Sequence, residues 1–137
     1  DSNRHNILMD TVRDVERIGD HFENIIELVD YKEVNRLILT EDAIKDVSEM
    51  FELTIETVSI SLEALDTSNV ELAKKVSEQE NVIDKMERQF RKNHILRVNQ
   101  GTCSGQAGIV FVDILSNLER IGDHASNIAE TVLGKRI

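Results

Sequence analysis

The sequence predicts an all-α protein, an elongated antiparallel helical bundle of four long helices. Proline is absent, aromatic residues make up only 4% of the chain, and apolar residues recur every three or four positions in four segments. With 137 residues, 40% of them hydrophobic, the chain is long enough for one domain with its own core. The longest apolar stretch, near Ile109 to Val112, is far shorter than the roughly 18 residues typical of a membrane helix.

The first and last predicted helices are two copies of one element. The hexapeptide Glu-Arg-Ile-Gly-Asp-His occurs at residues 16–21 and again at 119–124. A repeat of this length, with matching neighbours, indicates a duplicated structural unit. In both copies a glycine, Gly19 or Gly122, stands in the apolar stripe and is expected to let another helix approach closely. The two inward stripes are predicted to be Leu8, Val12, Val15, Gly19, Phe22, Ile26 and Val29, and Phe111, Leu115, Leu118, Gly122, Ala125, Ala129 and Val132.

Two further helices are predicted between the copies. The second should run from Glu41 to about Leu65, with Thr40 as its N-cap and Leu39 packed against Ile44. Its inward residues are expected to be Ile44, Val47, Phe51, Ile55, Val58, Leu62 and Leu65. The third should begin after Ser68, where Ser68-x-x-Glu71 matches a capping box, and continue to about Val98 through Leu72, Val76, Ile83, Met86 and Phe90.

The connections are predicted from breaks in these patterns. Residues 31–39 form a longer connection of undefined form, 66–69 a short turn, and 99–105 a loop with two glycines, while Gly134 is placed to end the last helix. The chain starts at Asp1 without Met and inside a helical pattern, so we expect it to be a piece of a longer protein.

The charge balance limits the classes of partner. Acidic residues number 26 against 16 basic ones, so the net charge is −10 with neutral histidine. This charge disfavours nucleic acid and anionic lipid, and it favours cations or basic protein surfaces, or serves solubility alone. The single cysteine, Cys103, indicates a reducing, cytoplasmic setting, and we interpret it as a loop residue without a histidine partner.

Three Glu-x-x-x-Asp pairs are candidate metal ligands. Carboxylates one helical turn apart lie about 6 Å apart along the axis, close enough to hold a hard cation. If the third and fourth helices lie side by side, two of the pairs meet in one pocket, and four such anions repel one another unless cations fill it. Ordinary hydration of an acidic helix is the alternative. The three pairs are Glu16 with Asp20, Glu80 with Asp84, and Glu119 with Asp123.

Other chemistry is less well supported. No histidine follows a glutamate by three positions, so the Glu-x-x-His pairs of ferritin-like di-iron bundles are absent. His21 and His124 point about 100° away from the preceding aspartates and are expected at an interface or a helix end. Arg13, Arg17 and Arg120 have carboxylates one turn away and are expected to pair with them. No nucleophile-base arrangement or phosphate-binding loop is present, so we expect no enzymatic activity, and metal-assisted phosphoester hydrolysis has little support.

The stretch from Leu118 to Glu130, Leu-Glu-Arg-Ile-Gly-Asp-His-Ala-Ser-Asn-Ile-Ala-Glu, resembles the signature helix of the PhoU family. These are helical phosphate-regulation proteins built from tandem three-helix repeats. The preceding part, from His94 to Asn117, looks most like the cytoplasmic C-terminal PhoU-like domain of bacterial sodium/phosphate cotransporters. The resemblance implies that residues 1–30 are the trailing helix of one repeat and that residues 40–137 form a complete repeat.

The resemblance also implies function. Several PhoU-like proteins carry iron or zinc clusters on such motifs, so the three pairs are candidate ligands of a divalent or trivalent ion (Fe, Zn, Mn or Mg). The expected role is a regulatory domain at the cytoplasmic face of the plasma membrane, acting on the membrane part of the same sodium-dependent phosphate transporter. The alternatives are a free-standing adaptor of an ABC phosphate importer and a sensor kinase, or a purely structural oligomerisation module. The helix that would complete the Glu16/Asp20 site is missing unless a homodimer supplies it, and the apolar stripe of the first helix would favour such a dimer.

Overall fold

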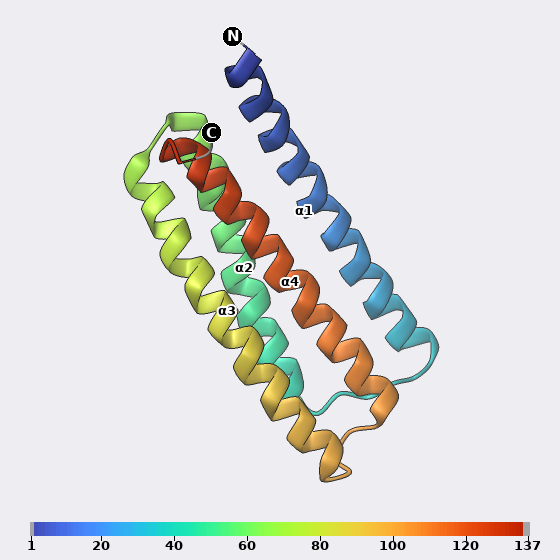
Figure 1. Ribbon diagram of the computed structural model, residues 1–137. Coiled ribbons are helices and arrows are strands. Elements are labelled where there is room, and N and C mark those ends of the chain that lie inside the picture. The colour runs from blue at the N-terminus through green and yellow to red at the C-terminus, as the bar shows by residue number, and fades with distance from the viewer. Residues whose placement is uncertain (1, 136–137) are drawn as a thin grey trace.

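The computed structural model describes residues 2–135, which form four helices and no strand. They are α1 (Ser2–Val34), α2 (Glu41–Thr67), α3 (Val70–Asn99) and α4 (Gly105–Val132). Consecutive helices run in opposite directions and build an elongated bundle (Figure 1). The predicted fold class is therefore confirmed. Within the described residues, no helix is both long and apolar enough to cross a membrane.

The last helix, α4, is the centre of the molecule. It packs against all three other helices, whereas α2 and α3 also pack against each other and the backbone of α1 approaches α4 alone (Figure 1). The predicted stripe of α4 is buried from Phe111 to Ala129, and a second row that includes Ile114, Ile121 and Ile128 is buried as well. The fold is thus a three-helix bundle of α2, α3 and α4, with α1 laid against the outer side of α4.

Local capping interactions fix most helix ends. Thr40 caps α2 as predicted, since its hydroxyl accepts from the Ala43 N–H at 3.2 Å. The predicted capping box at Ser68 is wrong. Ser68 has a φ of 52° and ends α2, and Asn69 caps α3 by accepting from the Leu72 N–H at 3.1 Å. Gly134, with a φ of 73°, follows the end of α4 as predicted.

The first helix is longer than predicted. Residues 31–34, expected to belong to a connection, form its last turn, and the helix ends before Arg36. Arg36 has a φ of 54°, and its N–H and that of Leu37 donate to the carbonyls of Glu33 and Lys32. A residue other than glycine in this conformation is a weak signal in a sequence, which explains why the end of the helix was misplaced.

The predicted inward face of α2 is wrong by about one residue. The buried side chains are small or hydroxyl-bearing: Ala43, Met50, Thr54, Thr57, Ser61 and Ala64. The hydroxyls of Thr54 and Thr57 donate to the carbonyls of Met50 and Leu53 at 2.8 and 2.7 Å, so their burial leaves no polar group unpaired. The larger residues of the predicted stripe stay partly exposed, including Ile44 (50%), Phe51 (37%), Ile55 (41%) and Leu62 (41%).

The predicted stripe of α1 is mostly exposed too. Only Thr11, Asp14, Ile18 and Ile25 of this helix are buried, all on the side that faces α4. A Cβ atom on Gly122 would lie 3.3 Å from Cδ1 of Ile83, so this glycine allows the close approach that was predicted. A Cβ atom on Gly19 would meet nothing within 4 Å. The face that carries the glycine is therefore covered by α3 in the second copy and is open in the first copy.

Candidate metal centre

Two of the predicted carboxylate pairs converge between α3 and α4. One carboxylate oxygen from each of Glu80, Asp84 and Asp123 lies within 4.8 Å of the other two. The close packing of Gly122 on Ile83 brings together the helix turns that carry the neighbouring residues Asp123 and Asp84. Glu119, one turn before Asp123, is half-buried beside them. The side-by-side arrangement of the third and fourth helices that was proposed from the sequence is therefore present.

The electrostatics of this cluster favour a positive charge. Burial, together with the Asp123 and Asp84 carboxylates, raises the pKa of Glu80 from 4.5 to about 8. Burial and the charges of Asp123 and Asp84 raise the pKa of Glu119 to about 7. Oδ1 of Asp84 is buried and has no hydrogen-bond partner. A cation or extra protons would relieve this repulsion.

The basic residues nearby do not supply that charge. Arg91 forms an ion pair with Glu87, one turn beyond Asp84, and also donates to the Ser116 hydroxyl at 3.1 Å. In residues 2–135, no lysine, arginine or histidine forms an ion pair with Glu80, Asp84, Glu119 or Asp123; the basic residues that pair with carboxylates do so elsewhere. No basic side chain of the described residues therefore neutralises the four carboxyl groups, and bound protons or a cation must do so.

The donor set matches hard cations. Four carboxylate side chains on two helices offer only oxygen ligands, as Mg²⁺, Mn²⁺ and iron prefer, and they lack the cysteine or histidine ligands of structural zinc sites. A cation would give the Asp84 oxygen a partner and would lower the pKa of Glu80. An ion held here would link α3 to α4.

The third predicted pair is not part of a cluster. Glu16 and Asp20 are exposed on α1, and no second acidic pair of the described chain approaches them. They share the sequence of Glu119 and Asp123 but lack a partner helix. One acidic pair joins a carboxylate cluster and the other does not because α3 packs beside the second copy alone, since the two motifs have the same sequence.

A polar seam between α1 and α4 relates the two copies by approximate two-fold symmetry. The rings of His21 and His124 stack at its centre, with centroids 5.7 Å apart. Asp14 and Asn117, which occupy equivalent positions in the repeat, each accept from a histidine and an asparagine of the opposite helix. The four hydrogen bonds are His21 to Asn117 (2.9 Å), Asn24 to Asn117 (3.2 Å), His124 to Asp14 (2.9 Å) and Asn127 to Asp14 (3.3 Å). The predicted interface role of the two histidines is confirmed.

Cys103 lies in the loop between α3 and α4 as predicted, but the prediction that it has no histidine partner is wrong. Its buried sulfur lies 3.4 Å from Nε2 of His94, whose ring stacks on Phe111 at 4.1 Å. Arg97 donates to Nδ1 of His94, and it approaches Asp46 at 3.5 Å. Because Nδ1 accepts, the neutral ring carries its proton on Nε2 and donates toward the thiol. Burial raises the pKa of Cys103 and lowers that of His94, so this pair is neutral packing and not an activated nucleophile.

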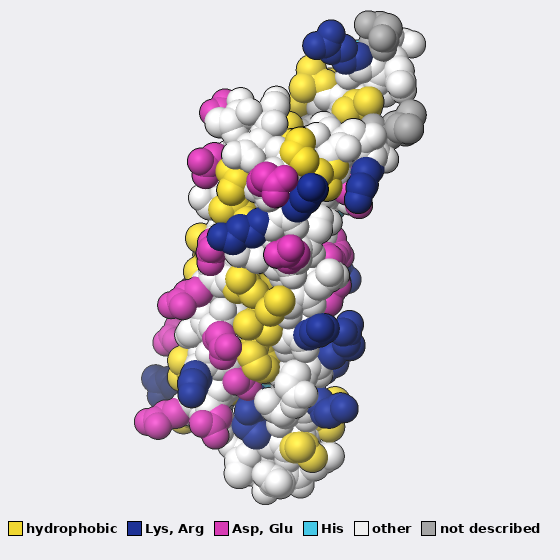
Figure 2. Space-filling model, turned by 90° about the vertical axis from the view of Figure 1, so that its left-hand side faces the viewer, with side chains coloured by type: hydrophobic (Ala, Val, Ile, Leu, Met, Phe, Trp, Pro, Cys, Tyr) yellow, Lys and Arg dark blue, Asp and Glu magenta, His cyan; other side chains and the backbone are white. Residues whose placement is uncertain are grey.

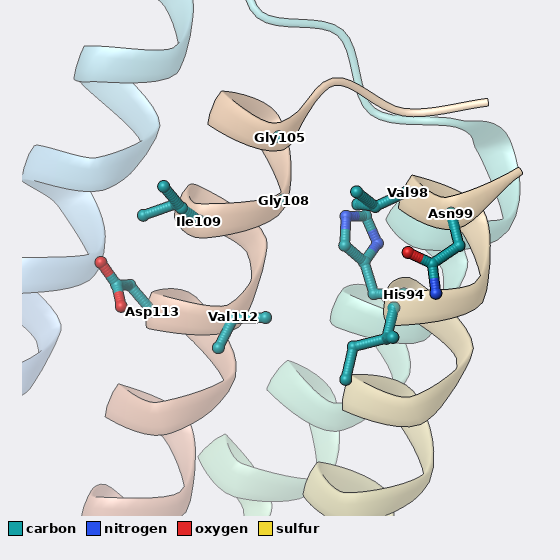
Figure 3. Close-up of a pocket in the computed structure, with 9 residues that line it drawn as sticks. His94, Val98, Asn99, Gly105, Gly108, Ile109, Val112 and Asp113 are labelled. Carbon is teal, nitrogen blue, oxygen red and sulfur yellow. The ribbon is translucent and has the colours of Figure 1, made fainter. Parts of the chain in front are cut away.

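A hollow of about 330 Å³ lies beside His94, between the end of α3 and the start of α4 (Figure 3). Its walls are mainly apolar, with Val98, Ile109 and Val112 among them. Asp113 and Ile109 point away from His94 in this view, and Asn99 lies beside His94 on the α3 wall (Figure 3). The hollow therefore has no arrangement of side chains that indicates catalysis or metal binding.

The comparisons with known proteins agree with this geometry. Residues 47–132, from α2 to the end of α4, match the model of the PhoU domain, and the chain belongs to the PhoU family. It is 34% identical over 125 residues to a phosphate-specific transport system accessory protein, PhoU homolog 1, of Thermotoga maritima, a match that covers 88% of this chain and 51% of that protein. It is 35% identical over 98 residues to the PhoU homolog of Aquifex aeolicus, covering 68% of this chain and 43% of that protein. The chain thus spans about half the length of these relatives, and no solved structure matches it.

Proposed function

We propose that this chain is a regulatory, non-enzymatic unit of a PhoU-type adaptor that controls a phosphate importer from the cytoplasmic side of the membrane. The match of α2, α3 and α4 to the PhoU domain carries this proposal. Both relatives are named as accessory proteins of phosphate-specific transport. Neither is named as a cotransporter, so these findings favour the free-standing adaptor over the cotransporter domain. The residues from His94 to Asn117 keep the cotransporter domain as a second candidate.

The carboxylate cluster is proposed to hold one or more divalent or trivalent ions, among Mg, Mn, Fe and Zn. Glu80 and Asp84 would bind from α3, and Glu119 and Asp123 from α4. The bound ion would supply the positive charge that the cluster lacks and would fix the two helices relative to each other. All four carboxylates would be engaged as ligands of the ion, so we propose a structural and signalling role for it and no turnover.

Removing the gene tests the regulatory role. Uptake of labelled phosphate should lose its dependence on external phosphate in the deletion strain, and the gene in trans should restore it. Unchanged regulation would contradict the proposal. Affinity capture of the full-length product, cross-linked in cells, should recover importer subunits. A membrane segment encoded in the same polypeptide, with no importer subunit recovered, would instead establish the cotransporter domain.

A pair of matched variants tests the ion site. Purified protein treated with chelator should bind Mn²⁺ or Fe²⁺ in a calorimetric titration, and Glu80→Gln with Asp84→Asn should abolish that binding. The control is Glu16→Gln with Asp20→Asn, which changes the same motif where no second helix approaches and should leave the titration unaltered. Equal binding by both variants, or no binding by the unmodified chain, would favour a structural module with hydrated carboxylates.

A further inference from the structure

The second half of α3 has a charge opposite to that of the whole chain. Among residues 85–99, five are basic and only Glu87 is acidic, whereas the chain has a net charge of −10. Three of the five basic residues are exposed, and in the described part of the chain they form no ion pair; they are Lys85, Arg88 and Lys92, called here the basic strip. Figure 2, a view onto the α3 side, shows basic side chains next to hydrophobic ones in the lower half of the molecule.

The apolar hollow between α3 and α4 opens beside the basic strip. Ile95 lines the hollow from α3 and Ile109 lines it from α4, and these side chains are 52% and 66% exposed. Lys92 precedes Ile95 by three residues and Arg88 precedes it by seven, so both basic side chains lie on the side of α3 that carries Ile95. An apolar hollow of about 330 Å³ is therefore bordered by basic side chains without a carboxylate partner.

Contacts between α3 and α4 fix the shape of the hollow. Arg91 of α3 donates to the hydroxyl of Ser116 of α4 at 3.1 Å, and this bond joins the helices between the hollow and the carboxylate cluster. On the wall of the hollow, a Cβ atom on Gly108 would lie 3.0 Å from Cγ2 of Val98, so this glycine allows the two helices to approach closely. The hollow is thus formed before any partner binds.

The first helix does not cover the hollow. All the residues that line it belong to α3 and α4. In Figure 3, α1 lies beyond Ile109 and Asp113, on the opposite side of α4 from His94. A segment packed on the outer side of α1 would have α4 between itself and the hollow. The hollow therefore belongs to the free surface of the three-helix bundle of α2, α3 and α4.

We propose that the hollow and the basic strip form a docking site for an acidic amphipathic helix of a partner protein. The apolar side chains of this helix enter the hollow between Ile95 and Ile109, and its carboxylates face Arg88 and Lys92. Apolar anchors three or four residues apart are typical of a helix that binds in a groove. The proposal rests on the proposed adaptor function for the identity of the partner, because it names the surface through which the adaptor contacts it.

The charge distribution favours a single helix over an anionic membrane. The net charge of −10 repels an extended anionic surface, and Asp113 is exposed next to Ile109. A helix about 10 Å wide can instead stay close to the basic strip, within a Debye length of roughly 8–10 Å at physiological salt. The hollow also admits side chains that project from a helix, which the surface of a bilayer does not supply.

A synthetic peptide tests the chemistry of the docking site. The probe is a fluorescent amphipathic peptide of about 18 residues with leucine on one face and glutamate on the other. In an anisotropy titration, the chain should bind this peptide and not its counterpart with lysine in place of glutamate. Arg88→Glu with Lys92→Glu should weaken binding by roughly tenfold or more. The control is Lys74→Glu with Lys75→Glu, which makes the same charge change on the first half of α3 and should leave binding unaltered.

A substitution without a charge change tests the hollow itself. Gly105 lines the hollow, and a Cβ atom on it would meet nothing within 4 Å, so Gly105→Leu should fill the hollow without disturbing α4. This variant should lose peptide binding and keep the urea midpoint of the unmodified chain. Gly19→Leu is the matched control, since a Cβ atom there also meets nothing within 4 Å, and it should bind the peptide normally.

Three results would overturn the proposal. One is an unmodified chain that does not bind the acidic peptide or binds the lysine peptide equally well. Another is a Gly105→Leu variant that binds as the unmodified chain does. The third is binding to vesicles rich in phosphatidylglycerol that Gly105→Leu and the charge change at Arg88 and Lys92 both abolish, because a membrane would then be the occupant.

Photo-cross-linking of the full-length product in cells tests the natural partner. A photo-reactive residue in place of Ile109 should cross-link to an acidic helix of an importer subunit, and one in place of Val70, at the start of α3, should not. If deletion of the gene leaves the regulation of phosphate uptake unchanged while peptide binding depends on the hollow, the proposed function fails and the docking site stands. If regulation requires the gene but Gly105→Leu changes neither regulation nor cross-linking, the docking site fails and the proposed function stands.

Discussion

The carboxylate cluster should make the metal-free protein less stable as the pH rises. Glu80 has a pKa of about 8 in the folded protein against 4.5 for an ordinary glutamate, so the folded protein keeps this proton to higher pH than the unfolded chain does. The stability that accompanies the bound proton is complete below pH 4.5 and is lost as the pH rises through 8. Glu119, with its pKa raised to about 7, acts in the same direction.

The magnitude follows from the raised pKa of Glu80. Its full conversion would give roughly 5 kcal/mol, at about 1.4 kcal/mol for each pH unit. Because the side chain is only half-buried and solvent screens its charge, we expect roughly 1–2 kcal/mol. Glu80→Gln removes the titrating group, so the metal-free variant should be more stable than the unmodified protein at pH 8.5 by roughly that amount, and equally stable at pH 5.

Urea denaturation in the presence of chelator, repeated between pH 5 and pH 9, measures the effect. Glu16→Gln is the matched control, since Glu16 begins the same hexapeptide on the exposed side of α1 and should follow the unmodified protein at every pH. With a saturating divalent ion the sign should reverse, because the variant loses a ligand. Two results would refute this account of the cluster as a site of mutually repelling carboxylates. One is a metal-free protein whose free energy of unfolding does not change over this pH range, and the other is a Glu80→Gln variant whose free energy of unfolding changes with pH as much as that of the unmodified protein.

Three other perturbations have defined outcomes. Arg36→Gly should raise the free energy of unfolding by roughly 1 kcal/mol, because Arg36 has a φ of 54°; an unchanged urea midpoint would contradict this. Asp14→Ala should lower the free energy of unfolding by roughly 1–3 kcal/mol, because His124 and Asn127 lose a buried acceptor. Asp14→Asn keeps an acceptor oxygen and should cost less. Equal losses in the two variants would contradict the importance of these hydrogen bonds. The thiol of Cys103 should react with a thiol reagent only as fast as the protein opens, and Cys103→Ala should keep the fold; rapid labelling of the native protein would show that the contact with His94 is open.

The sequence predicted the fold better than it predicted the faces of the helices. The three-to-four-residue spacing of apolar residues, the absence of proline and the duplicated hexapeptide were sufficient to predict four helices. They also predicted the buried stripe of α4, because a helix surrounded by other helices buries nearly every apolar residue. On α2 the assumption that the large apolar residues face inward was wrong. Thr54, Thr57 and Ser61 take the inner positions because their hydroxyls bond to the backbone of their own helix and their small size lets the helices pack closely.

The candidate site shows a similar limit. The spacing of Glu80, Asp84, Glu119 and Asp123 placed two acidic pairs on helix faces that could meet, and the structure brings them together. The spacing could not separate these pairs from Glu16 and Asp20, because the difference is the presence of a second helix. The contact of Cys103 with His94 joins a loop to a helix end, and no periodic pattern reports such a contact.

The seam between α1 and α4 has a consequence for the history of the chain. Two equivalent helices cross on an approximate two-fold axis, with His21 stacked on His124 and with reciprocal hydrogen bonds to Asp14 and Asn117. Such reciprocity is the mark of a contact between identical subunits. The same reciprocity would result if a gene that encodes a self-pairing helical unit duplicated and its two products were joined.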